Sequence, residues 1–231
     1  ALIAALAKRV KDAIADTSVK GIVLTGAGRA FATSADDTGK KPAKGAQSLR
    51  DVAQMIEECP KPVVAAINGG CFGMGLELAL ACHARFAAAG AQLGMPDIKL
   101  GLVPGAGGTQ RLPRIVGAQN ALDMIVNGTS VKAAEAKSTG LVDDVIEGNL
   151  VEAAAAWARR AVGDAIALPR ASKRTDKIAG TPSDLFSGFR KSIARRSRGF
   201  EAPFQAVDLI EAAATLSFAK GVAKEQAVAE K

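Results

Sequence analysis

The chain has 231 residues, 48% of them hydrophobic and 23% charged, a balance that is typical of a globular protein able to bury a full core. No apolar run approaches the roughly 18 residues that cross a bilayer, and no basic-then-apolar leader precedes the first helix, so we expect neither a membrane span nor export. The net charge of +7 favours an acidic partner, which could be a polyphosphorylated cofactor, nucleic acid or an anionic surface.

Much of the basic charge lies between residues 170 and 198, where it forms either a solvated helical face or a nucleic-acid contact. Aromatic residues make up 4% of the chain and tyrosine is absent, so few side chains could stack on bases, and we do not expect nucleic acid as the main ligand. The cysteines at 59, 71 and 82 are odd in number and lack metal-ligand spacing, which predicts buried free thiols.

The first third of the chain alternates between helix and strand patterns. Leu2, Leu6 and Val10 recur at helical spacing, so a helix is expected at the start. A strand at 21–25, a polar loop at 36–45, a helix at 47–59 and a fully apolar strand at 63–67 follow. An apolar strand of this kind is typical of a covered parallel sheet.

The alternation continues to about residue 150 and then stops. We expect helices at 76–82, 109–116, 120–126 and 130–138 and strands at 85–89 and 141–146, hence an α/β core with right-handed crossovers. His83 is expected to be a satisfied histidine at a helix end. Further on, only helices at 150–162, 185–198 and 203–214 and a basic connector at 168–182 are predicted. The chain is therefore divided into a core at 1–150 and a helical C-terminal extension at 151–231.

A glycine-rich turn between the strand at 63–67 and the next helix is the strongest chemical signal. The helix carries Glu77 in its first turn, and Asp97 follows twenty residues later, ahead of a second glycine cluster. The amides at a helix start are unpaired and the helix dipole adds positive potential, which favours an anion hole. A carboxylate beside such a hole indicates acid/base chemistry next to an enolate.

Three motifs resemble the crotonase superfamily of enoyl-CoA hydratases and isomerases. They are Leu24-Thr-Gly-Ala-Gly-Arg-Ala-Phe31 leading to Ala35-Asp36, Asn68-Gly69 with Gly73-Met-Gly-Leu-Glu77, and Pro96-Asp97 with Pro104-Gly-Ala-Gly-Gly-Thr-Gln-Arg-Leu112. The resemblance implies an α/β fold, a crotonase (ClpP-like) spiral of ββα turns with a helical C-terminal extension. Residues 168–178, Ala202-Pro203 and 218–225 are most similar to the end of the hydratase half of bifunctional fatty-acid oxidation enzymes.

The resemblance also implies the site residues. The oxyanion hole would use the amides of Ala35 and Met74; Glu77 would activate water and Asp97 would deliver the α-proton. No metal and no redox cofactor are implied, because coenzyme A is part of the substrate. The implied substrate-binding residues are Phe31, Thr33, Ser34, Asp36, Gly73 and Gly75, and Lys40, Lys41 and Lys44 are either phosphate neighbours or a solvated loop.

Three positions depart from the family pattern. Met74 and Ser34 stand where glycine is usual in the family. Asp97 stands where glutamate is usual, and its side chain is one methylene shorter. Met74 could crowd the thioester, and a shorter acid could weaken hydration, since a misplacement of about 1 Å can cost about a hundredfold in rate.

The favoured function is reversible hydration of trans-2-enoyl-CoA to 3-hydroxyacyl-CoA in fatty-acid β-oxidation. The alternatives are Δ3-Δ2-enoyl-CoA isomerisation, acyl-CoA binding with weakened or lost catalysis, and RNA binding through the basic C-terminal segment.

The expected partners are the acyl-CoA thioester and a 3-hydroxyacyl-CoA dehydrogenase, attached or separate, with no membrane. No GxGxxG motif follows a strand, so the dehydrogenase half is absent from this sequence. The family's opening strands also have no counterpart before Ala1, which indicates a fragment or a trimmed chain. The chain is expected to be a homo-oligomer or a monomer covered by its C-terminal helices, in the cytoplasm or alternatively in a mitochondrial or peroxisomal matrix.

Overall fold

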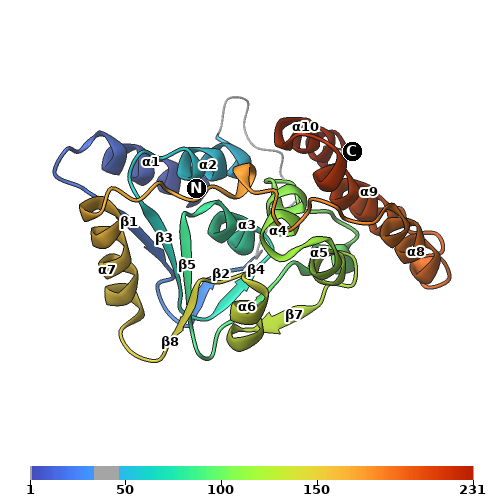
Figure 1. Cartoon of the computed structure of the whole chain (residues 1–231), viewed down its shortest axis with the longest axis horizontal. Helices are drawn as coiled ribbons and strands as arrows, with labels where there is room; N and C mark the ends of the chain where they lie inside the picture. The colour runs from blue at the N-terminus through green and yellow to red at the C-terminus, as the bar shows by residue number, and fades with distance from the viewer. Residues whose placement is uncertain (1, 34–46, 231) are drawn as a thin grey trace.

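Two four-stranded sheets, surrounded by helices, form the centre of the molecule. The computed structural model describes residues 2–33 and 47–230. In Figure 1, helices α1 (Leu2–Ala15), α2 (Leu49–Glu57) and α7 (Leu150–Gly163) lie around the first sheet, and the later helices extend to the opposite side.

The first sheet is parallel, with the order β1 (Ile22–Thr25), β3 (Val63–Ile67), β5 (Ala84–Ala88) and β8 (Asp144–Ile146). All five residues of β3 are buried, because α7 covers one face of this sheet and the main core lies against the other. The uninterrupted apolar run at 63–67 therefore reflects burial on both faces, as expected for a central parallel strand.

The second sheet consists of three-residue strands, in the order β2 (Ala30–Ala32), β4 (Gly70–Phe72), β6 (Gln92–Gly94) and β7 (Ser130–Lys132). Its first three strands are parallel, and β7 is antiparallel to β6. Successive strands alternate between the sheets from β1 to β6. The turns β1–β2–α2 and β3–β4–α3 (Met74–Ala81), followed by β5–β6 and the short 3₁₀ helix η1 (Pro96–Leu100), confirm the expected spiral of ββα turns.

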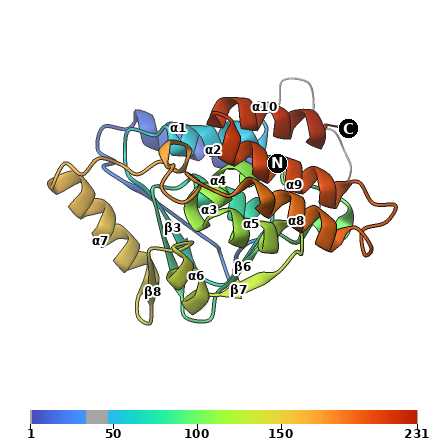
Figure 2. The ribbon, with the colours of Figure 1, turned by 45° about the vertical axis from the view of Figure 1, so that its right-hand side comes forward.

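The middle helices are α4 (Gly108–Val116), α5 (Ala118–Ile125) and α6 (Ala133–Thr139). Beyond α7 and η2 (Ala171–Lys173), the chain forms α8 (Ser183–Ile193), α9 (Ala202–Thr215) and α10 (Phe218–Ala229). Helix α9 packs against α4, α5 and α8, and α10 packs against α9 and α4. Figures 1 and 2 show these helices on the side of α4 and α5, away from α7. The helical C-terminal extension is confirmed, whereas a domain boundary at 151 stays a prediction; α7 itself covers the first sheet.

The sequence patterns missed the short elements. Residues 130–138 were predicted to be one helix, but the structure has β7 and then α6. Strands β2, β4 and β6 and helix α10 were also not predicted from the local patterns. Strands of three residues are too short for an alternation of apolar and polar side chains to be recognised.

The buried sulfur and imidazole groups agree with the sequence predictions. The three cysteines are free and buried. His83 is 2% exposed, and its Nδ1 accepts the Val63 N–H at 2.9 Å. It therefore stabilises the junction between α3 and the first sheet.

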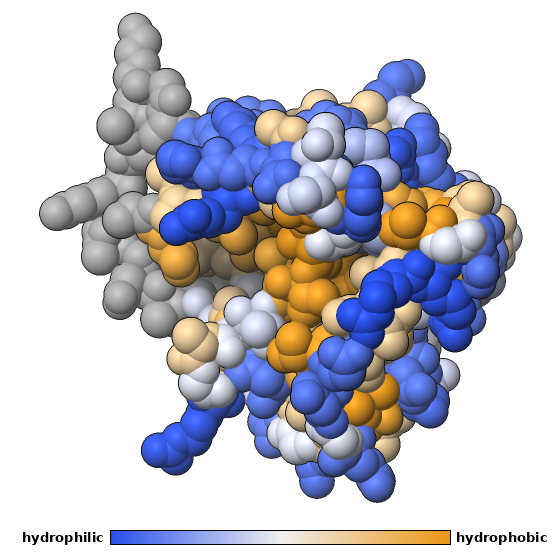
Figure 3. Space-filling view, turned by 90° about the vertical axis from the view of Figure 1, so that its left-hand side faces the viewer, coloured by the Kyte–Doolittle hydropathy of each residue, from blue (hydrophilic) through white to orange (hydrophobic). Residues whose placement is uncertain are grey.

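Strand β1 is an edge of the first sheet, and its three apolar residues are only half-buried. Figure 3 faces the side of the molecule that carries α1, β1 and α7 and shows hydrophobic side chains in a hollow between hydrophilic borders. None of the described helices is long and apolar enough to cross a membrane.

Candidate active site

Glu77 lies at the centre of the candidate site, in the first turn of α3. Its side chain is buried, with the residue 3% exposed. Its Oε1 accepts two hydrogen bonds, from the Ala106 N–H at 2.7 Å and from the Gly108 N–H at 2.8 Å. Both donors belong to the glycine-rich loop that precedes α4. Both of these bonds fall on Oε1 of the carboxylate.

The surroundings of Glu77 favour its protonated form. Burial, the neighbouring Glu225 carboxylate and, to a smaller extent, the Asp97 carboxylate together raise its pKa to about 8, although the hydrogen bonds from the Ala106 and Gly108 amides oppose the rise. A carboxyl group that titrates near neutral pH can both take up and release a proton, as a general acid or base must.

Asp97 is half-buried in the first turn of η1. Its Oδ2 is buried and has no hydrogen-bond partner among the described residues. Burial raises the pKa of Asp97, and its charge in turn raises the pKa of Glu77, so the fold brings the two predicted catalytic carboxylates together. A buried, unpaired carboxyl oxygen is costly for stability, and such groups are frequent at functional sites.

Two glycines at the start of α3 bring the surrounding segments together. Gly73 has a φ of 52°, which favours glycine, and its N–H donates to the Gly94 carbonyl at 3.0 Å, at the end of β6 shortly before Asp97. A Cβ on Gly75 would lie 2.2 Å from the carbonyl oxygen of Ala32. The start of α3 therefore touches both the end of β2 and the end of β6.

Some of the other predicted residues lie in the part of the chain that the structure describes, and some lie outside it. Met74 is the first residue of α3, one helical turn before Glu77. Phe31 is half-buried in β2, and Thr33 follows that strand and is exposed. Ser34, Ala35, Asp36, Lys40, Lys41 and Lys44 lie outside the described residues. Because Ala32 lies against Gly75, the end of β2 lies beside the start of α3.

Glu225, on α10, is a further residue of the site that was not predicted from the sequence. Its carboxylate is fully buried and accepts hydrogen bonds from the same loop as Glu77, from the amides of Gly107 and Thr109 and from the Thr109 hydroxyl. The one signal available in the sequence is that Gly221 and Glu225, four residues apart, share a helix face; they are the buried residues of α10.

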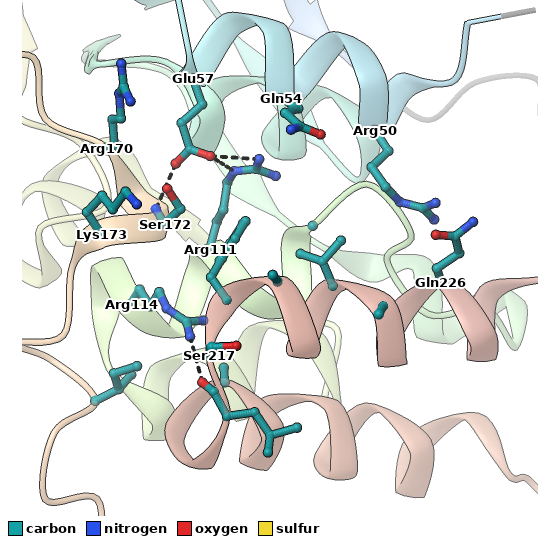
Figure 4. Close-up of a pocket in the computed structure, with 18 of the residues that line it drawn as sticks. Arg50, Gln54, Glu57, Arg111, Arg114, Arg170, Ser172, Lys173, Ser217 and Gln226 are labelled. Atoms are coloured by element: carbon teal, nitrogen blue, oxygen red, sulfur yellow. Dashed lines mark hydrogen bonds and ion pairs between the residues drawn. The ribbon is translucent and has the colours of Figure 1, made fainter.

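A cavity of about 1300 Å³, lined by both charged and apolar side chains, lies beside this site, between α2, α4, η2 and α10. Figure 4 shows its basic side chains and the buried ion pair between Arg111 and Glu57, at 2.9 Å. Neither Glu77 nor Asp97 lines the cavity. In the part of the chain that the structure describes, no group of three or more histidine, cysteine or acidic side chains could hold a metal ion.

The chain is similar to known proteins over most of its length. The family model for enoyl-CoA hydratase/isomerase matches residues 1–183. The chain is 38% identical to the peroxisomal fatty acid beta-oxidation multifunctional protein MFP2 of Arabidopsis thaliana, covering 97% of this chain and 33% of that protein. It is 37% identical to the human peroxisomal bifunctional enzyme (94% and 30% covered) and to the fatty acid oxidation complex subunit alpha of Shewanella halifaxensis (91% and 32%).

Solved structures agree with the sequence relatives. An enoyl-CoA hydratase from Bacillus anthracis superposes with a TM-score of 0.59 at 30% identity, covering 99% of this chain and 79% of that one. Pseudomonas aeruginosa DspI superposes with a TM-score of 0.64 at 29% identity, covering 87% and 78%. The chain spans about a third of the length of the curated relatives that it matches.

Proposed function

The chain belongs to the enoyl-CoA hydratase/isomerase family, and we propose that it catalyses the reversible hydration of trans-2-enoyl-CoA to 3-hydroxyacyl-CoA in fatty-acid β-oxidation. The observation that carries this proposal is the buried Glu77 carboxyl group, held by two loop amides, beside the Asp97 carboxyl group whose Oδ2 has no described partner.

The thioester oxygen is bound in a hole made of main-chain N–H groups. In this proposal the Met74 amide at the start of α3 donates one hydrogen bond and the Ala35 amide donates the other. The contact between Gly75 and Ala32 supports this pairing, because it brings the two segments side by side. Charge that develops on the thioester oxygen is stabilised by donors fixed before the reaction. The mechanism therefore uses no metal and no redox cofactor, and coenzyme A enters as part of the substrate.

Glu77 and Asp97 divide the proton transfers. Ionised Glu77 takes a proton from water as the water oxygen bonds to C3 of the enoyl chain, and the electron pair of the double bond moves into the enolate. Protonated Asp97 then delivers a proton to C2, and the carbonyl re-forms. Burial keeps the pKa of Asp97 above its ordinary value, which supports its role as the donor. The reverse sequence dehydrates the 3-hydroxyacyl thioester.

The residues expected to bind the substrate around the oxyanion hole follow from the same proposal. Phe31, Thr33, Ser34 and Asp36 would line the path of the pantetheine arm, and Gly73 and Gly75 would let the thioester approach the backbone. The names of the relatives include peroxisomal bifunctional enzymes and a fatty acid oxidation complex subunit. They support a 3-hydroxyacyl-CoA dehydrogenase as partner and a peroxisomal matrix or the cytoplasm as compartment.

Double-bond isomerisation is the second candidate, because one carboxylate can move a proton between C4 and C2 of a 3-enoyl thioester. The aspartate at position 97, shorter than glutamate, favours this alternative over efficient hydration. Assays of the purified chain with crotonyl-CoA and with a 3-enoyl-CoA distinguish the two reactions. Fast isomerisation without hydration would refute the hydratase proposal, and acyl-CoA binding without turnover of either substrate would refute both.

A further inference from the structure

Helix α10 brings a second buried carboxylate to the loop that holds Glu77. The side chain of Glu225 is completely buried. Its Oε1 accepts the Gly107 N–H at 2.6 Å, and its Oε2 accepts the Thr109 N–H at 3.0 Å and the Thr109 hydroxyl at 2.5 Å. Gly107 is the N-cap of α4 and has no side chain to bond the first amides of the helix. Glu225 therefore supplies this cap from another helix.

The two glutamates take alternate amides of one short loop. Glu77 accepts from residues 106 and 108, and Glu225 accepts from residues 107 and 109. All four amides of residues 106–109 are therefore held by one or the other carboxylate, which fixes the backbone of the loop. The bonds that Glu225 makes to residues 107 and 109 therefore help to hold the neighbouring donors of Glu77 in place.

We propose that Glu225 is a positioning residue for Glu77, which holds the 106–109 loop and the start of α4 in the conformation that presents two amides to the catalytic carboxylate. This inference rests on the proposed role of Glu77 as the base. Glu225 also acts electrostatically, because its negative charge favours the protonated form of Glu77.

Packing keeps α10 against α4. A Cβ on Gly221 would lie 1.9 Å from Oε1 of Gln110, so any larger residue at 221 would displace the buried Gln110 side chain. The Phe218 ring lies 5.2 Å from the Arg111 guanidinium carbon and 5.3 Å from that of Arg114. The contacts of Phe218 and Gly221 lie in the first turns of α10, before Glu225, and they orient Glu225 toward the loop.

The other charged groups facing this pair come from α2, α4 and η1. Asp97 raises the pKa of Glu77. Arg50, which donates to the Gly105 carbonyl, lowers the pKa of Glu225, against the rise caused by burial. The Arg111 guanidinium lies beside Gly107 and is paired with Glu57. Removal of the charge at 225 therefore leaves Glu77 facing only one other carboxylate among the described residues.

The test compares Glu225→Gln and Glu225→Asp with Glu230→Gln, a control that removes one charge from the exposed end of the same helix region. Steady-state hydration or isomerisation of enoyl-CoA is measured across pH for the full chain. For Glu225→Gln we expect kcat to fall about tenfold to a hundredfold, as for a displacement of about 1 Å. KM should change little, and the pH midpoint of kcat/KM should move down by about one pH unit or more, because a like charge is lost.

Glu225→Asp keeps the negative charge, but its side chain is one methylene shorter and no longer reaches the loop amides. We therefore expect a lower kcat with the same pH midpoint of kcat/KM as in the wild type. A wild-type kcat and midpoint in Glu225→Gln would overturn the inference. If Glu225→Gln does not fold, a wild-type kcat in Glu225→Asp would overturn it instead. Failure of the proposed function is distinguishable, because in that case Glu77→Gln would itself retain activity.

Discussion

Replacing Glu77 by glutamine is expected to remove activity and to make stability less dependent on pH. The glutamine carbonyl oxygen can accept the same two N–H groups as Glu77 Oε1, so the loop contacts are retained. What is lost is the proton acceptor. Because one general base contributes about 10² to 10⁴ in rate, kcat should fall by that factor.

The effect on stability follows from the raised pKa. Folded Glu77 binds its proton up to about pH 8, whereas the ordinary value is 4.5. Between these values the folded state holds a proton that the unfolded state has released, so stability falls as the pH rises. At about 1.4 kcal/mol for each pH unit, the loss amounts to at most about 5 kcal/mol. This contribution is fully present below pH 4.5 and is lost once the pH exceeds 8.

Urea unfolding at pH 5 and pH 9 measures this difference. We expect the wild type to lose more stability between the two pH values than Glu77→Gln does. Glu135→Gln, on the exposed surface of α6, is the matched control and should behave like the wild type. A Glu77→Gln variant that hydrates crotonyl-CoA at the wild-type rate, or whose stability falls with pH as steeply as that of the wild type, would refute the reasoning.

Two further substitutions and the pH profile of the wild type test other parts of the site. Gly75→Ala places a Cβ 2.2 Å from the Ala32 carbonyl oxygen; it should cost about 1–3 kcal/mol in unfolding free energy and about a hundredfold in kcat, and an unperturbed enzyme would contradict the close approach. Arg111→Met leaves the buried Glu57 carboxylate without its ion-pair partner and should destabilise the fold by about 3–5 kcal/mol in urea unfolding; a loss below about 1 kcal/mol would argue against the pair. The wild-type kcat/KM for hydration should rise with pH through about 8, as Glu77 loses its proton; a profile that is flat from pH 6 to 9 would exclude Glu77 as the base.

The parts of the fold that the sequence predicted are those with a strong local signal. Strand β3 was recognised because all its residues are apolar, and the structure buries every one. The turn before α3 was recognised because Gly73 and Gly75 surround a position that starts a helix with Glu77 in its first turn. The four strands of the second sheet have three residues each, and pairing with distant strands, rather than local preference, makes them extended.

The loop at 105–109 shows why the rest of the site could not be predicted. A backbone amide is the same in every residue, so the sequence does not tell which N–H groups bind a carboxylate. Glu77 lies about 30 residues before the loop amides that it binds. Glu225 lies 118 residues after Gly107 and 116 residues after Thr109. The packing of α10 against α9 and α4 brings these segments together, and the place of Gly221 against Gln110 in that contact is not evident from the residue type. The proposed chemistry of Glu77 was therefore predicted from its own motif, whereas Glu225, the group proposed to fix its surroundings, belongs to the C-terminal extension. It follows that a change confined to α10 should alter the pH dependence of catalysis without touching the substrate.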